Sequence, residues 1–185
     1  DICECGVFKG SGIFTWVKLI KLFKPNNDFK VIGFDFFENK RKLKFKYKSD
    51  KKVQAFHNSG GISQKDLFKK CKEWDFKNLK LYAGDVKKTS KKYAMESFGS
   101  RIALLYLDVD NYEGTLEVLK NLYNKMSKGG IIVFDEYGLQ GHGESDAVDK
   151  FFSKKKLKLK SFGWANSPTA YIIVDWLKNN MGNLR

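Results

Sequence analysis

The stretch RIALLYLDVDNYEGT, residues 101–115, is the clearest indication of the fold in the sequence. Ile102 to Leu107 form an uncharged apolar run, which is typical of a strand buried on both faces. Two carboxylates, Asp108 and Asp110, follow directly, and apolar residues at helical spacing begin after Tyr112. A buried strand that ends on acids and leads into a helix predicts a parallel strand of an α/β sheet.

Strand-like and helix-like segments alternate along the rest of the chain. The expected strands are Ile2–Cys5, residues 29–35, residues 79–85, Ile102–Leu107 and residues 131–136. The expected helices are one capped by Ser11 that runs to about Phe23, one capped by Ser63 that runs through Trp74, Tyr112–Met126, and Ala147–Lys155. Leu157–Phe162 and Tyr171–Trp176 predict a closing antiparallel hairpin. The basic segment Asn39–Lys52 has no clear periodicity, and a lysine-rich connection is expected from Asp85 to Gly99.

Seven strands with helices between the first five predict a Rossmann-like, doubly wound α/β sheet, mostly parallel with a C-terminal antiparallel hairpin. A chain of 185 residues fits one domain, so residues 1–185 are expected to form a single domain. The sequence lacks a starting Met and begins at once on a core strand. We therefore expect an excerpt of a longer protein, without a helical or lid segment that precedes the first strand.

Composition narrows the class of protein. The sequence is 42% hydrophobic, too rich for a disordered chain, yet no apolar run approaches the roughly 20 residues of a membrane span. Three cysteines without zinc spacing or a disulfide framework favour a reducing cytoplasm. The net charge of +14 invites a nucleic-acid interpretation, but the lysines are spread over the whole chain and indicate mainly a solvated surface. The densest run, residues 154–160, leaves a phosphate-binding face as an alternative.

Acidic residues end four of the first five strands. These residues are Asp35, Asp85, Asp108 with Asp110, and Asp135 with Glu136. In a doubly wound sheet the carboxyl ends of the strands meet at the ligand crevice, so the acids converge and raise one another's pKa. Three of them, Asp108, Asp135 and Glu136, make an oxygen-rich set that suits Mg²⁺ or another hard divalent cation. Such an ion lowers the pKa of a substrate hydroxyl.

The first loop, ECGVFKGSG at residues 4–12, points to a cofactor. Its glycines allow close backbone approach, but it does not match the dinucleotide fingerprint G-x-G-x-x-G. Glu4 repels a pyrophosphate and suits an ammonium or sulfonium group, which disfavours an NAD-dependent oxidoreductase. Asp35 stands where an acid commonly holds ribose hydroxyls, and Asp85 is either an adenine contact or a helix cap.

Five segments in order resemble the macrocin O-methyltransferase family, whose members methylate sugar hydroxyls with S-adenosylmethionine and a divalent metal. These segments are ECGVFKGSG, VIGFDFFE, LYAGD, IALLYLDVDNYEGT and MSKGGIIVFDEYG. The match runs from Glu4 to about Phe152. The family usually has a second Asp where this chain has Glu136, and reads FDSFEG where this chain reads FDFFEN.

The resemblance implies a role for each site residue. The cofactor contacts would be Glu4, Gly6, Val7 and Ser11 at the methionine part, Asp35 and Phe36 at the ribose and adenine, and Asp85 and Val86 at the adenine. The metal ligands would be Asp108, Asp135 and Glu136, with Asp108 also the general base. His142, in the loop GLQGHGES, is a second catalytic candidate, and Asp110 is expected to cap the helix at Tyr112 or to support the metal site.

The expected activity is therefore transfer of a methyl group from S-adenosyl-L-methionine to a sugar or glycoside hydroxyl with Mg²⁺. The same carboxylates would serve a catechol-type O-methyltransferase. A basic, non-catalytic nucleic-acid-binding domain and a domain that binds cofactor without turnover are further alternatives. The sequence identifies neither the sugar nor the metal, and it leaves open whether the chain forms a homo-oligomer.

Overall fold

Six strands form one sheet in the order β3-β2-β1-β4-β5-β6 in the computed structural model, which describes residues 1–25, 28–39, 44–53, 60–154 and 158–175. The strands are β1 (Ile2–Cys5), β2 (Val31–Asp35), β3 (Leu79–Ala83), β4 (Ile102–Leu107), β5 (Met126–Phe134) and β6 (Ala170–Ile173). The first five are parallel, and β6 is antiparallel to β5. The predicted doubly wound α/β fold is confirmed.

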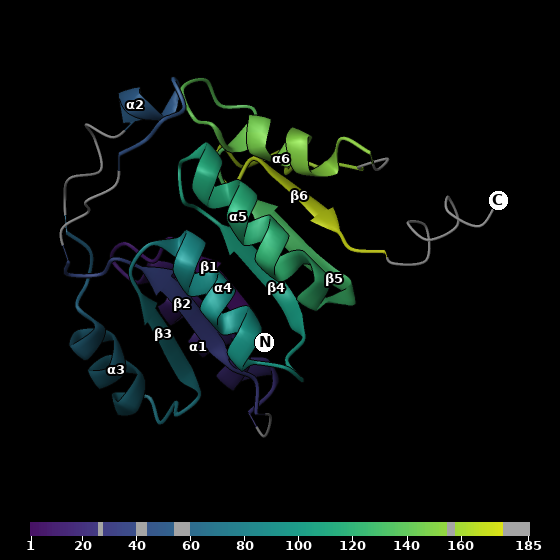
Figure 1. Cartoon of the computed structure of the whole chain (residues 1–185). Helices are drawn as coiled ribbons and strands as arrows, with labels where there is room; N and C mark the ends of the chain where they lie inside the picture. The colour runs from purple at the N-terminus through teal and green to yellow at the C-terminus, as the bar shows by residue number, and fades with distance from the viewer. Residues whose placement is uncertain (26–27, 40–43, 54–59, 155–157, 176–185) are drawn as a thin grey trace.

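Helices cover both faces of the sheet. They are α1 (Ser11–Phe23), α2 (Asp50–Val53), α3 (Gln64–Glu73), α4 (Val86–Glu96), α5 (Tyr112–Leu122) with a 3₁₀ turn η1 (Tyr123–Lys125), and α6 (Glu144–Phe152). Helices α4, α5 and α6 lie side by side over one face (Figure 1), where their apolar residues join those of β1, β2, β4, β5 and β6 in the larger core. Helices α1 and α3 pack on the other face in a second core. No described helix has the length and apolar character needed to cross a bilayer.

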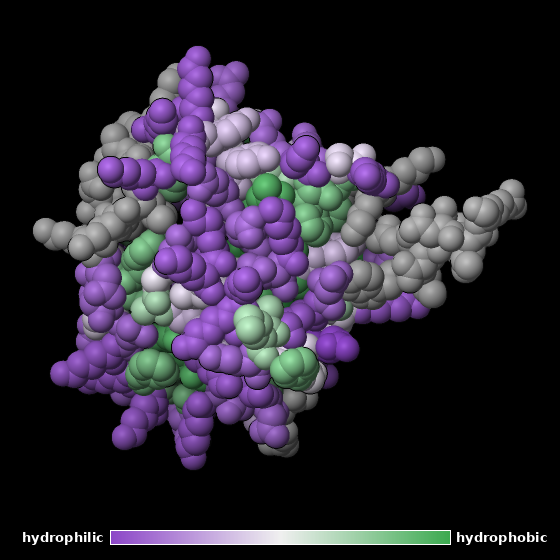
Figure 2. Space-filling view, in the orientation of Figure 1, coloured by the Kyte–Doolittle hydropathy of each residue, from purple (hydrophilic) through white to green (hydrophobic). Residues whose placement is uncertain are grey.

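The alternation of side chains along the strands explains the two cores. Ile32 and Phe34 of β2 point into the larger core, whereas Val31 of the same strand points into the second. Strands buried on both faces need apolar residues at nearly every position, which is why the sequence showed continuous apolar runs. Lysine-rich outer faces cover these cores, and the face in Figure 2 is mostly hydrophilic with isolated apolar patches.

The closing hairpin is the main departure from the predicted strands. Strand β6 pairs with β5, but the segment before it makes only one isolated bridge, between Lys160 and Tyr171, within the described residues. Leu159 is the apolar residue of that segment that packs on the core, so little apolar surface holds it as a regular strand. The predicted bounds Leu157 and Trp176 lie outside the described residues, as do Lys155 and Lys156 of the basic run.

Several helix boundaries also differ. The connection predicted after Asp85 contains α4, a helix missed because its lysines leave only Ser90 and Tyr93 fully buried. Ser11 does not cap α1: Gly10 is the N-cap at φ 84°, and no side chain caps that end. Helix α5 ends at Leu122 rather than Met126, because Met126 already begins β5. Ser63 caps α3 as predicted and accepts a hydrogen bond from the Asp66 amide.

The sheet order reverses between β1 and β4, which places the loop after β1 against the end of β4. The Cys5 carbonyl accepts the Asp108 amide at 2.9 Å, and a Cβ on Gly6 would lie only 1.7 Å from the Asp108 carbonyl oxygen. Gly6 also has φ +95°, a backbone conformation that favours glycine. Only glycine therefore fits where the first loop passes the switch point of the sheet.

We predict that Gly6→Ala lowers the free energy of unfolding by more than about 3 kcal/mol, because backbone strain and overlap add. Gly129→Ala is the matched control, since Gly129 has φ +76° and open space where its Cβ would lie. This control is expected to lose about 1 kcal/mol from backbone strain alone. Urea unfolding measures the loss of stability in both variants. Equal losses would show that the overlap with the Asp108 carbonyl adds nothing to the backbone strain.

Candidate active site

A pocket lies at the switch point between the ends of β1, β2 and β4. Six of the residues predicted to bind cofactor or metal line it: Gly6, Asp35, Phe36, Asp85, Val86 and Asp108. Phe45, Lys87 and Asn111 also line it and were not singled out from the sequence. The pocket brings together five of the eight predicted cofactor contacts, and Glu4, Val7 and Ser11 are not among its lining residues.

Asp35 fastens the first loop to the end of β2. One carboxylate oxygen, Oδ2, accepts the amides of Val7 and Phe8 at 2.7 Å each, and Oδ1 accepts the amide of Phe36. Val7 is buried in the second core and completes this anchor. Asp35 therefore fixes the backbone that forms one wall of the pocket, in addition to lining the pocket itself.

Glu4 lies under the first turn of α1. Its Oε2 accepts the indole N–H of Trp16 at 2.7 Å, and a Cβ on Gly12 would lie 2.3 Å from its Oε1. Burial raises the pKa of Glu4 to about 8, the Trp16 hydrogen bond opposes the rise, and Asp108 and Asp35 add to it. Ser11, expected beside it at the cofactor, is exposed.

Carboxylates from neighbouring strand ends meet beside the pocket. Asp108, Asp135 and Glu136 each offer an oxygen, and the three oxygens lie within 4.8 Å of one another. Glu136 is only 8% exposed, and its Oε2 has no hydrogen-bond partner. Burial raises the pKa of Glu136 well above its usual range, and the side-chain hydrogen bond with Asp110 adds to the rise. A buried carboxylate oxygen without a donor, in a set of hard oxygen ligands, fits a divalent cation.

Two hydroxyl groups orient Asp135 within this cluster. Tyr106 donates its hydroxyl to Oδ1, and Ser167 donates to Oδ2 at 2.6 Å. Tyr106 reaches Asp135 from β4, the strand that pairs with β5. Neutral donors of this kind fix the direction of a carboxylate without cancelling its charge.

Asp110 and His142 form a second group of possible ligands with Glu136. The Nδ1 atom of His142 is 3.8 Å from Asp110 and 4.0 Å from Glu136. Asp110 does not cap α5, because Asn111 is the N-cap and accepts the Gly114 amide at 2.7 Å. Asp110 instead has φ 60°, which aspartate tolerates better than most residues.

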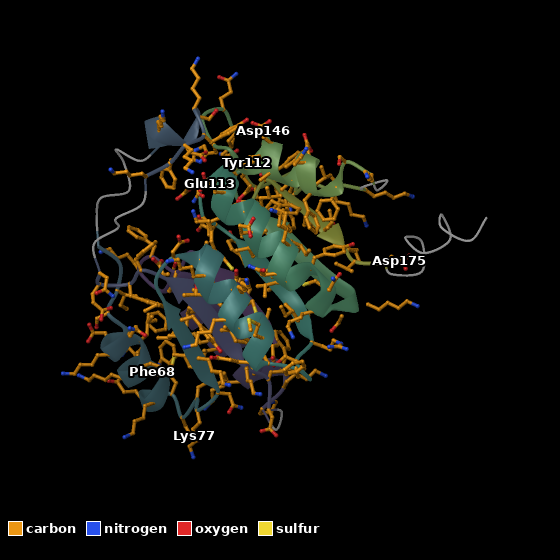
Figure 3. The ribbon with its side chains drawn as sticks, viewed as in Figure 1. Phe68, Lys77, Tyr112, Glu113, Asp146 and Asp175 are labelled. Carbon is orange, nitrogen blue, oxygen red and sulfur yellow. The ribbon has the colours of Figure 1, made fainter. Side chains whose placement is uncertain are left out.

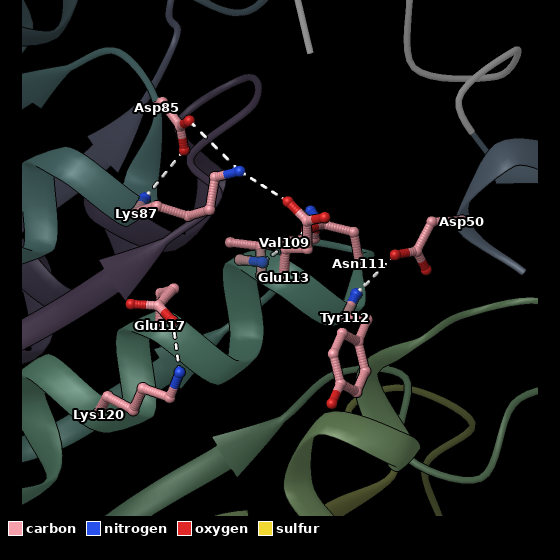
Figure 4. A network of polar contacts seen from close by, with 10 residues as sticks. Asp50, Asp85, Lys87, Val109, Asn111, Tyr112, Glu113, Glu117 and Lys120 are labelled. Carbon is pink, nitrogen blue, oxygen red and sulfur yellow. Dashed lines mark hydrogen bonds and ion pairs between the residues drawn. The ribbon is translucent and has the colours of Figure 1, made fainter. Parts of the chain in front are cut away.

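Asp85 caps α4 and accepts the Lys87 amide at 3.0 Å (Figure 4). The same figure shows Lys87 bridging Asp85, at 3.8 Å, and Glu113, at 2.8 Å. This chain of charges links the start of α4 to the start of α5. The helix-cap interpretation of Asp85 is confirmed, and its position on the pocket wall keeps the adenine contact as a prediction.

Sequence reasoning missed the segment Lys44–Asp50, which crosses the site. Phe45 lines the pocket, and Tyr47 stacks on Tyr112 with ring centroids 4.6 Å apart. Asp50 is fully buried and accepts the amides of Tyr112 at 2.8 Å and Gly143 at 3.0 Å. These partners are distant in sequence, so only the alternation of aromatic residues in KFKYKSD hinted at them.

The site lies at one end of the helical layer. Figure 3 shows Tyr112, Glu113 and Asp146 together at the ends of α5 and α6, far from Phe68 and Lys77 at the α3 end. Tyr47 donates its hydroxyl to Asp146, which extends the contacts of the crossing segment onto α6. The starts of α5 and α6 are thereby held against the carboxylate cluster.

Known proteins resemble this chain in sequence and fold. The macrocin-O-methyltransferase (TylF) family matches residues 1–163. Demethyldecarbamoylnovobiocin O-methyltransferase of Streptomyces niveus is 28% identical over 113 residues, which cover 58% of this chain and 41% of that protein. The chain thus spans less than half of the curated relative it matches.

Solved structures extend the similarity to the fold. CalS11, a TDP-rhamnose 3′-O-methyltransferase of calicheamicin biosynthesis, superposes with a TM-score of 0.73 at 27% identity, over 93% of this chain and 70% of that one. The O-methyltransferase NovP superposes with a TM-score of 0.78 at 23% identity, over 95% of this chain and 72% of that one. The fold is shared across nearly the whole chain.

We predict that stability falls as pH rises from about 4.5 to about 8, and that Glu4→Gln removes part of this fall. The raised pKa of Glu4 keeps it protonated in the folded chain while the unfolded chain is ionised, so unfolding releases a proton in this window. Between these pH values, the difference in the free energy of unfolding between the wild type and Glu4→Gln should change by about 1 kcal/mol per pH unit.

Urea unfolding at several pH values, with divalent cations removed, measures this difference. Glu117→Gln, at a partly exposed residue of α5 that pairs with Lys120, is the control and should leave the slope unchanged. Parallel wild-type and Glu4→Gln curves would contradict the buried, protonated state of Glu4.

Proposed function

Because the chain belongs to the macrocin O-methyltransferase family, we propose that it transfers a methyl group from S-adenosylmethionine to a sugar hydroxyl, with Mg²⁺ or a similar divalent cation at the carboxylate cluster. One observation carries the proposal: Asp108 both lines the pocket and belongs to the cluster. A cofactor in the pocket and an acceptor oxygen at the cluster would therefore meet at the end of β4.

The names of the relatives support a sugar as the acceptor. CalS11 is described as a TDP-rhamnose 3′-O-methyltransferase, and it is 27% identical to this chain. The novobiocin enzyme is also an O-methyltransferase. A nucleotide-linked deoxysugar is accordingly the first acceptor to test.

The three cysteines of this chain are buried and form no disulfide, which supports a cytoplasmic location in our proposal.

Each residue of the site would have a separate role in the proposed methyl transfer. When bound, the cation supplies positive charge that lowers the pKa of an acceptor hydroxyl, and S-adenosylmethionine supplies an electrophilic methyl group. Asp108, Asp135 and Glu136 would hold the cation, and the hydrogen bonds from Tyr106 and Ser167 keep Asp135 aligned. Asp108 would accept the proton of the acceptor hydroxyl that is methylated. Gly6 and Asp35 shape the wall that positions the methyl donor.

The cofactor assignment is tested by calorimetric titration of S-adenosylmethionine. We predict that binding survives Asp108→Ala and collapses in Asp35→Ala, because Asp35 holds the first loop by its amides. Asp28→Ala, at an exposed residue before β2, is the control. Absence of binding to the wild type would contradict the cofactor assignment for this chain.

The acceptor is tested by mass spectrometry of methylated products. TDP-rhamnose with Mg²⁺ should give a product carrying one extra methyl group, and a chelator should abolish it. Asp108→Asn should lower the rate at least about 100-fold through loss of the base. Methylation of a catechol but of no sugar would contradict the sugar assignment and favour the catechol-type alternative.

A further inference from the structure

We propose that the cluster holds a second divalent cation, bound by Asp110, Glu136 and His142, so that Glu136 bridges two ions. This inference rests on the proposed function for the first ion, at Asp108, Asp135 and Glu136. Each of the two sets offers three ligand atoms that lie within 4.8 Å of one another. The two sets share only Glu136.

The distances around His142 fit ligands that share an ion. Its Nδ1 is 3.8 Å from Asp110 Oδ1 and 4.0 Å from Glu136 Oε1, both too long for a direct hydrogen bond. With bonds of about 2.1 Å to the ion, two ligand atoms are separated by about 3 to 4.2 Å. The three groups therefore stand around a space of the size that a cation fills.

Two groups of the second set, His142 and Glu136, carry buried atoms without a hydrogen-bond partner, and Glu136 presents its other oxygen, Oε1, to His142. Nδ1 of His142 and Oε2 of Glu136 are both buried and without a hydrogen-bond partner, and Glu136 as a whole is only 8% exposed. Groups of this kind normally find a donor, an acceptor or a bound ion. The carboxylate of Glu136 has two oxygens, so it can serve one ion on each side.

The surrounding backbone is built to hold these ligands in place. The buried carboxylate of Asp50 accepts the amides of Tyr112 and Gly143, which lie within two residues of Asp110 and next to His142. Gly143 itself has no room for a side chain, since its Cβ would lie 2.5 Å from Asp50 Oδ1. Asp50 thus ties together the two loops that carry the ligands.

Charge favours a second ion. Glu144 is fully buried, and its Oε1 accepts the Glu136 amide at 3.0 Å. Within the described residues, no lysine or arginine forms an ion pair with Asp135, Glu136 or Glu144. One divalent ion offsets only two negative charges, fewer than the five carboxylates of Asp108, Asp110, Asp135, Glu136 and Glu144 can carry.

The ligand types indicate which ion each set prefers. Three carboxylates suit Mg²⁺, whereas two carboxylates and an imidazole suit a transition ion such as Mn²⁺, Co²⁺ or Zn²⁺. Mn²⁺ is the useful probe because carboxylates and imidazole both accept it, and because its electron paramagnetic resonance reports bound ions and coupled nitrogen nuclei.

The test is a titration of the whole chain with Mn²⁺, followed by electron paramagnetic resonance. We expect two ions per chain, one of them coupled to a ¹⁴N nucleus. His142→Ala should bind one ion without nitrogen coupling. Asp135→Asn, which removes a ligand of the first set alone, should keep the nitrogen-coupled ion. Asp28→Asn, at an exposed position, should behave as the wild type.

Other results would overturn the inference in distinguishable ways. One ion in the wild type without nitrogen coupling would exclude the second site and leave the first. One ion with nitrogen coupling would place the single ion at His142, and would overturn both the pair of ions bridged by Glu136 and the first site. Two ions in His142→Ala would place the second ion away from His142. No bound ion in the wild type would overturn both this inference and the metal part of the proposed function.

Discussion

Buried carboxylates forced together at the carboxyl edge of a parallel sheet are the constraint on which the site depends. Strands β4 and β5 pair in parallel, with Leu107 beside Phe134, so Asp108 and Asp135 leave their strands side by side. Glu136 and Glu144 lie behind them, at 8% and 0% exposure. Folding alone gains nothing from crowding like charges in a place with little water, since each raises the pKa of the others. The divalent cation that we propose would offset this repulsion.

The same topology couples the carboxylate cluster to the pocket. The reversal of strand order between β1 and β4 brings the first loop against Asp108, and this approach requires glycine at position 6. Asp35 then fixes the loop from the neighbouring strand. The segment Lys44–Asp50 reaches from the pocket to the starts of α5 and α6, so one stretch of chain contacts both halves of the site.

The sequence predicted the parts of the molecule that depend on local pattern. Apolar runs marked β1 to β5, and the acids that end them identified the edge where Asp108, Asp135 and Glu136 meet. Features that depend on tertiary contacts were missed. Helix α4 was hidden by its lysines, Asn111 rather than Asp110 caps α5, and the role of Asp50 arises from amides distant along the chain. None of these contacts could be predicted from the composition or from local sequence patterns.

Calorimetric unfolding of the wild-type chain at increasing Mg²⁺ concentration shows whether the carboxylate cluster binds a cation. An ion that binds only the folded cluster stabilises it by RT ln(1 + [Mg²⁺]/Kd), so we expect the unfolding midpoint to rise steadily with Mg²⁺. The rise should vanish when Asp108 and Glu136 are both replaced by the corresponding amides. A midpoint that is independent of Mg²⁺ in the wild type would contradict the claim that these buried carboxylates are there to hold a cation.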